Sequence, residues 1–204
     1  MAVSQEGVPS SPHVIYICLM LTGITLATVE TTSRQPRQRI LSMDIPPRFI
    51  IHETPHWILN HHMSTKLPGY LVLGTKHPVR ALFDLPASAL AELGVMLASV
   101  QKKLQTELDP KWLYISRFGH DPRFPVHFHF IPVYHWVEDL FWQNDRYRLL
   151  RGLGAIDAQS ACDGAELTLF VWREFGEKPE PPNIQGPSIE QIIDHLRLLF
   201  KQEY

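Results

Sequence analysis

Residues 125–132, Pro-Val-His-Phe-His-Phe-Ile-Pro, carry two histidines spaced two residues apart. Alternate side chains of a β-strand share one face. His127 and His129 are therefore predicted to project together from a strand, while Val126, Phe128 and Phe130 face a core. Two imidazoles held side by side on a rigid strand indicate a site for metal, phosphate or proton transfer.

The residues alone leave three interpretations of this histidine pair open. The two side chains could be partly buried and satisfied by backbone carbonyls, with no chemical role. Both could ligate a metal, with His120 or Glu138 as a further ligand, although Glu138 lies too far along the chain for the His-x-His…Glu spacing of metal-binding cupin barrels. In the third, one imidazole is a nucleophile and its neighbour an acid or phosphate ligand, because an imidazole attacks phosphorus and leaves it readily.

The bulk composition is that of an ordinary soluble globular protein. The chain has 204 residues, 45% hydrophobic and 20% charged, which fits one domain with an appendage. A net charge of −2 gives no electrostatic reason to expect a nucleic-acid polymer as partner. The two cysteines, Cys18 and Cys162, form no CxxC pair and indicate a reducing compartment, so we expect a cytoplasmic protein.

The first part of the chain differs in character from the rest. Residues 14–29 carry no charge but are shorter than the about 20 apolar residues that span a membrane, and no Lys or Arg precedes them as in a signal peptide. No stable membrane association is expected. We predict that residues 1–42 form a flexible or weakly apolar extension and that the folded domain begins near Met43.

The segment 43–140 has the pattern of an α+β domain. Leucine and valine residues three or four apart predict a helix over 86–108 that packs by one face, and Asp109-Pro110 ends it. The predicted contact face comprises Leu90, Leu93, Leu97, Val100, Leu104 and Leu108. Runs rich in β-branched and aromatic residues predict strands at 49–54, 56–61, 70–76, 112–118 and 125–132. We expect an antiparallel sheet of about five strands with the long helix on one face.

Residues 141–204 are predicted to form a C-terminal extension of helix, strand and helix that packs on this domain. Leu167-Thr-Leu-Phe-Val-Trp has strand-like composition. Ser188 is predicted to cap the last helix, with Gln191 at capping-box spacing.

Residues 49–136 resemble the histidine triad (HIT) family of nucleotide hydrolases and transferases. The family signature is His-x-His-x-His followed by two apolar residues, and residues 126–132 match its second half. Ile58-Leu59-Asn60 resembles the strand whose end contacts the nucleotide. Pro68-Gly69-Tyr70-Leu-Val-Leu with Lys76-His77, and Leu82-Phe83-Asp84-Leu85, resemble two further family segments in the same order.

The resemblance implies a HIT-like fold, a homodimer, and a small-molecule nucleotide as substrate, with no cofactor and no metal. It makes His127 the nucleophile that attacks the α-phosphorus, with one ring nitrogen held by a backbone carbonyl. It makes His129 a phosphate contact that assists the leaving group, and Asn60 a contact to the ribose side.

The chain departs from the family pattern at the phosphate contacts. Pro125 stands in place of the first triad histidine, and Tyr70 replaces the histidine of Pro-Gly-His. The loop over 117–124 lacks the usual Gly-Gln-Ser/Thr contact, so His120 and Arg123 are predicted to supply phosphate-binding charge from it. The other histidines between residues 52 and 135 are expected to have structural or surface roles; they are His52, His56, His61, His62, His77 and His135. Of these, His62 and His77 could approach the site.

Three functions are therefore open. The first is a hydrolase or nucleotidyl transferase that cleaves the α-phosphate linkage of a dinucleoside polyphosphate or nucleoside phosphoramidate through a nucleotidyl-histidine on His127. The second is a non-catalytic nucleotide-binding module of the same fold, and the third is a metal-binding protein that uses the same His-x-His pair.

A chain shortened to begin at Met43 is expected to fold, because the predicted strands and helices all lie after this residue. Circular dichroism and a cooperative thermal melt would test this. Loss of the cooperative transition on removal of residues 1–42 would show that the extension is part of the folded domain.

Overall fold

The structure is a computed structural model that describes residues 44–118, 124–144 and 164–202. The predicted extension 1–42 lies outside these ranges, as do His120 and Arg123. Within the described ranges, no helix combines the length and apolar character that crossing a membrane requires.

A five-stranded antiparallel sheet forms the centre of the fold, in the order β1-β2-β3-β5-β4. The strands are β1 (Ile50–Glu53), β2 (Trp57–His61), β3 (Leu71–Thr75), β4 (Trp112–Ser116) and β5 (His127–Val133), and a 3₁₀ turn, η1 (Pro47–Phe49), precedes β1. The predicted α+β fold with this sheet is confirmed, and each predicted strand between residues 49 and 132 is found close to its expected place.

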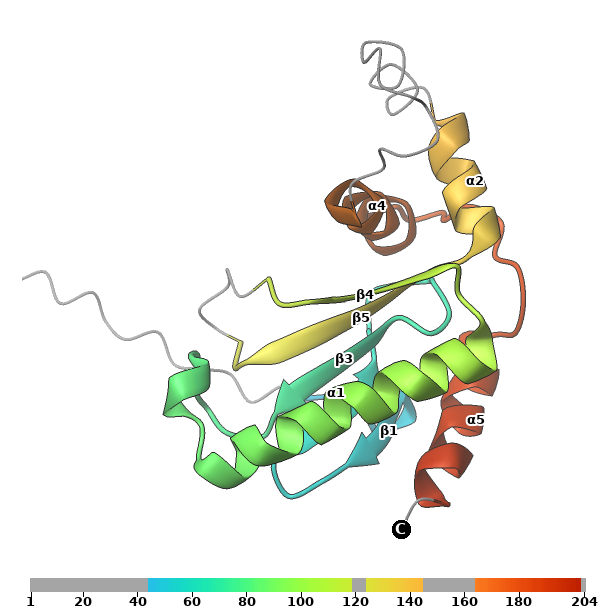
Figure 1. The fold of residues 1–204 in the computed structure, drawn as a ribbon. Helices are drawn as coiled ribbons and strands as arrows, with labels where there is room; N and C mark the ends of the chain where they lie inside the picture. The colour runs from blue at the N-terminus through green and yellow to red at the C-terminus, as the bar shows by residue number, and fades with distance from the viewer. Residues whose placement is uncertain (1–43, 119–123, 145–163, 203–204) are drawn as a thin grey trace, which may run out of the picture. The chain divides into compact units, whose positions relative to one another are not determined.

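The predicted long helix is α1 (Ala87–Leu108), which follows a 3₁₀ turn, η2 (Leu82–Asp84). Pro86 precedes its first turn, and Asp109 ends it with a left-handed backbone conformation, φ 43°. Figure 1 shows α1 running along one face of the sheet. The predicted contact face is wrong at Leu90, which is 40% exposed, because Ala89 and Met96 turn inward instead.

Two apolar cores lie on opposite faces of the sheet. The first joins α1, the last helix α5 (Ile189–Lys201) and the inward residues of the strands, among them Trp57, Leu73 and Phe130. Trp57 is fully buried, and its indole N–H donates to the carbonyl of Ala89 at 3.0 Å. The second core contains Tyr70, Ile131 and Val133 from the other side of β3 and β5, packed against the elements that follow β5.

Those elements are α2 (His135–Gln143), α4 (Gly164–Val171) and the single π-helical turn η3 (Trp172–Glu177). The strand predicted over 167–172 is wrong, because this segment is helical. Leu167, Phe170 and Val171, spaced three and four apart, all enter the second core, where Phe170 meets the ring of Phe141 edge-on. Helical spacing of the buried residues prevailed here over β-prone composition.

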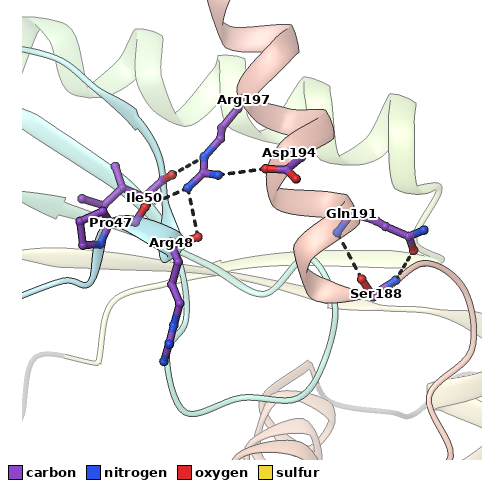
Figure 2. Close-up of polar contacts among 7 residues, drawn as sticks. All are labelled: Pro47, Arg48, Ile50, Ser188, Gln191, Asp194 and Arg197. Carbon is purple, nitrogen blue, oxygen red and sulfur yellow. Dashed lines mark hydrogen bonds and ion pairs between the residues drawn. The ribbon is translucent and has the colours of Figure 1, made fainter.

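Helix α5 begins with the predicted capping box. The Ser188 side chain accepts from the Gln191 backbone N–H at 3.2 Å, and the Gln191 side chain accepts from the Ser188 N–H at 2.8 Å. Farther along, Arg197 donates to the carbonyls of Pro47, Arg48 and Ile50 and to Asp194 (Figure 2). One guanidinium thus ties α5 to the start of β1.

Replacing Ser188 by Ala removes the acceptor for an otherwise unpaired helix N–H and is expected to lower the free energy of unfolding by about 1 kcal/mol. Ser188→Asp is the matched control, because an aspartate carboxylate caps the same N–H. Chemical denaturation of the three proteins would check this. Equal stability of the Ala and Asp variants would contradict a stabilising cap.

Candidate functional site

Strand β5 places His127 and His129 on one face of the sheet, as the alternation predicts. Their ring centroids lie 5.0 Å apart with the planes at 69°. The neighbouring Phe130 is fully buried on the opposite face, in the first core. His129 is only 9% exposed, because aromatic side chains surround it.

A backbone carbonyl fixes the ring of His127. Nδ1 of His127 lies 2.8 Å from the carbonyl oxygen of Pro125. A carbonyl only accepts, so Nδ1 carries the proton and donates it. In neutral His127 the lone pair therefore lies on Nε2, the arrangement that an imidazole nucleophile needs.

The proline at position 125 removes an imidazole but retains the carbonyl that orients His127. Pro125 is itself buried, and the next residue, Val126, is anchored by two backbone hydrogen bonds: its N–H donates to Val79 and its carbonyl accepts from Thr75, each at 2.9 Å. The segment before β5 is thus held in place without a side chain from residue 125.

Tyr70, which directly precedes the neighbouring strand β3, contacts His129. Its hydroxyl lies 3.3 Å from His129 Nδ1, and the side chain is 2% exposed. Burial raises the pKa of the Tyr70 phenol, so the hydroxyl remains protonated. The residue that the sequence marked as a departure from the family pattern is thus a direct partner of the second site histidine.

Asn60 lies in the same row of the sheet as His129. Asn60 pairs with Val72, and Val72 pairs with His129, so the three side chains share the site face. Asn60 is 3% exposed, and its Nδ2 donates to the His61 carbonyl at 2.8 Å. Its Oδ1 is buried and has no hydrogen-bond partner among the described residues. A buried acceptor without a partner is a candidate ligand contact.

His62, one of the two further histidines that were expected to be able to approach the site, lies in it. Its ring centroid lies 4.9 Å from that of Tyr70 and 5.8 Å from that of His129. Burial, with smaller contributions from His61 and His127, lowers the pKa of His62 to about 4. The signal in the sequence was the two-residue step from Asn60, which places residue 62 on the same face.

Two further aromatic side chains border the histidines. Trp172 of η3 meets the His62 ring edge-on with centroids 5.4 Å apart, and Phe118 lies 5.1 Å from the His129 ring. The C-terminal extension therefore contributes directly to the site. The side chain of Arg117, at the start of the loop before β5, donates to the carbonyl of Arg80 at 2.6 Å.

Four of the remaining histidines in this part of the chain, His52, His56, His61 and His77, have structural contacts. His56 and His77 bond to each other, Nδ1 to Nε2 at 2.9 Å, and the His52 ring stacks on Phe200. His61 is fully buried between the carbonyls of His62 and Leu67. Among the described residues His77 has this contact with His56, and its approach to the site stays a prediction.

The metal interpretation named Glu138 as a further ligand. Glu138 lies on α2, where Lys111 forms an ion pair with it and the Trp112 indole donates to it at 3.4 Å. Within the described ranges no three His, Cys, Asp or Glu side chains are grouped as metal ligands would be.

No protein-family model matches this chain, and no curated protein matches it. Several solved structures are similar to it. A Hit-like protein from Bartonella henselae is 18% identical, with a TM-score of 0.39 over 44% of this chain and 73% of its own. The NitFhit protein of C. elegans is 23% identical, with a TM-score of 0.40 over 52% of this chain and 28% of its own. A hypothetical histidine triad nucleotide-binding protein from Sulfolobus tokodaii is 12% identical, with a TM-score of 0.41 over 76% of this chain and 87% of its own.

These structures bear the name of the family that residues 49–136 resemble. The described chain has the α+β fold expected from that resemblance. Because every identity lies below 25% and every TM-score below 0.5, we infer what the site does from its own geometry.

The pKa of His62 predicts how stability depends on pH. The folded protein resists protonation of His62 down to about pH 4, whereas an unfolded histidine takes a proton near pH 6.5. His62 therefore contributes to stability above pH 6.5, and this contribution is lost as the pH falls from 6.5 to 4.

His62→Gln removes the titrating group and is expected to flatten this part of the pH profile. Thermal melts of the wild type and the variant between pH 7.5 and pH 4.5 would check this, with the difference between the two profiles isolating His62 from other groups. Parallel profiles would contradict the lowered pKa.

Proposed function

We propose that the protein is a HIT-type nucleotide hydrolase or nucleotidyl transferase whose nucleophile is His127. The observation that supports this best is the hydrogen bond from His127 Nδ1 to the Pro125 carbonyl, which leaves the lone pair on Nε2. An oriented imidazole with a free lone pair, beside a second, buried imidazole, is suited to covalent transfer of a phosphoryl-linked group.

In the first step, Nε2 of His127 attacks the α-phosphorus of the nucleotide. A P–N bond forms as the bond from phosphorus to the leaving group breaks. In the tautomer in which the Tyr70 hydroxyl donates to His129 Nδ1, the proton of neutral His129 lies on Nε2. From there the N–H can donate a hydrogen bond to the departing atom and stabilise the negative charge that develops on it, while the leaving group takes any proton it needs from water.

In the second step, water attacks the phosphorus of the nucleotidyl-histidine. The P–N bond breaks, the attacking water gives up a proton to solvent, a mononucleotide is released, and the lone pair of His127 Nε2 is free again. Asn60 is proposed to accept a hydrogen bond from a ribose hydroxyl through the otherwise unpaired Oδ1. His120 and Arg123 remain the proposed sources of phosphate-binding charge from their loop, and the reaction needs no cofactor.

A homodimer and a cytoplasmic location belong to this proposal as well. Size-exclusion chromatography with light scattering would test the first. The observation that favours a non-catalytic binding module instead is Pro125, which leaves one side of His127 without an imidazole.

Replacing His127 by Ala is expected to reduce turnover on the order of 10³-fold or more, because the nucleophile is lost, while nucleotide binding persists. Incubation of the wild type with dinucleoside polyphosphates and nucleoside phosphoramidates, followed by mass spectrometry under neutral conditions, should detect a nucleotidyl adduct on His127. His195→Asn, a substitution of an exposed histidine that pairs with Glu107 on the other side of the sheet, is the control.

Turnover by His127→Ala at the wild-type rate would reject the proposed nucleophile. Tight nucleotide binding by a wild type that turns over no member of the panel would establish the non-catalytic module instead.

A further inference from the structure

We propose that His62 is a third imidazole of the site and binds the phosphate chain of the leaving group, so that the enzyme prefers phosphoanhydride substrates such as dinucleoside polyphosphates over nucleoside phosphoramidates. This rests on the proposed function, because it assumes that His127 attacks the α-phosphorus. Three features of His62 support this: the position of its ring, the hydrogen bond to its Nδ1, and the side chains around it.

Strand register places the three imidazoles in order. His127 pairs with Gly74 and His129 with Val72 on β3. His62 directly follows β2, and its backbone N–H donates to the carbonyl of Tyr70 at 2.8 Å. Tyr70 lies two residues before Val72, the partner of His129, so His62 lies one step farther along the sheet than His129. His62 is therefore beyond His129 as seen from His127, on the side away from Pro125.

The row of imidazoles is thus shifted relative to the triad signature. An imidazole is lost at Pro125, before the nucleophile, and one is gained at His62, beyond the leaving-group histidine. The ring of His129 lies 5.0 Å from that of His127 and 5.8 Å from that of His62. A ligand on His62 therefore belongs to the part of the substrate that departs.

The hydrogen bond of His62 defines which nitrogen can bind a ligand. The Ser64 backbone N–H donates to His62 Nδ1 at 3.2 Å. Nδ1 is therefore the acceptor, and in the neutral ring the proton lies on Nε2. Burial lowers the pKa of His62 to about 4, so the ring is neutral at pH 7. His62 thus presents one N–H donor, which suits an anionic phosphate oxygen.

The surroundings hold this donor in place. Trp172 meets the His62 ring edge-on, and the loop that carries His62 is bound to the same turn, because the Lys66 N–H donates to the Phe175 carbonyl at 2.7 Å. The His62 side chain is half-buried, so a ligand can still reach it. A phosphoramidate whose leaving group is an amine offers no phosphate there, whereas a polyphosphate does.

Two substitutions separate the roles of the two ring nitrogens. His62→Asn keeps an acceptor near Nδ1 for the Ser64 N–H but has no donor at the place of Nε2. His62→Gln, one methylene longer, places its amide N–H close to Nε2. His195→Asn on α5 is the control for a histidine substitution outside the site.

The experiment measures kcat/KM for a dinucleoside tetraphosphate and for a nucleoside phosphoramidate in the wild type and all three variants. In His62→Asn the ratio of the two values is expected to fall by about 10-fold or more, the cost of one hydrogen bond to a charged group. His62→Gln should keep most of the wild-type ratio. Because both substrates are assayed on one preparation, the ratio is unaffected by the fraction of folded protein.

A ratio that is the same in His62→Asn and the wild type would overturn the role of His62, as would a wild type that prefers the phosphoramidate. In both cases the adduct on His127 would still be found and the proposed function would stand. Absence of the adduct and of turnover with either substrate would refute the proposed function itself.

Discussion

Strand β5 is held from both faces, and the geometry of the site depends on this. Phe130 is buried in the core beneath α1 and α5, while Ile131 and Val133 are buried in the core formed by α2, α4 and η3. A shift of the strand by one residue would exchange every side chain between the two faces. Because each core buries a different set of β5 side chains, the two cores together fix the register of the strand and keep His127 and His129 on one face.

The contact that orients the ring of His127 comes from the main chain, which explains how position 125 can tolerate proline. The carbonyl of residue 125 receives the His127 Nδ1–H whichever side chain stands there. Proline also has no backbone N–H to satisfy, and residue 125 lies just before β5, where no ladder hydrogen bond is lost. A proline at position 125 therefore leaves the tautomer of His127 unchanged.

The C-terminal extension is part of the site as well as of the fold. The turn η3 contributes Trp172 to the edge of the His62 ring and accepts a backbone hydrogen bond from the His62 loop through Phe175. This region has no counterpart in the segment that resembles the HIT family, which ends at residue 136.

The sequence by itself determined the features that depend on local spacing. Alternation in 125–132 placed both histidines on one face, helical periodicity located α1, and the Ser188–Gln191 capping box located the start of α5. Each rests on residues within a few positions of one another, where backbone geometry alone decides which side chains meet.

Only the tertiary structure decided the features that depend on distant neighbours. The segment 167–172 is helical because its residues meet Phe141 and β5 at helical spacing. His129 is buried because Tyr70 and Phe118 lie against it. His62 joins the site because Tyr70, His129 of β5 and Trp172 of η3 lie against its ring. Burial and side-chain partners are properties of the packed chain, so no spacing along the sequence records them.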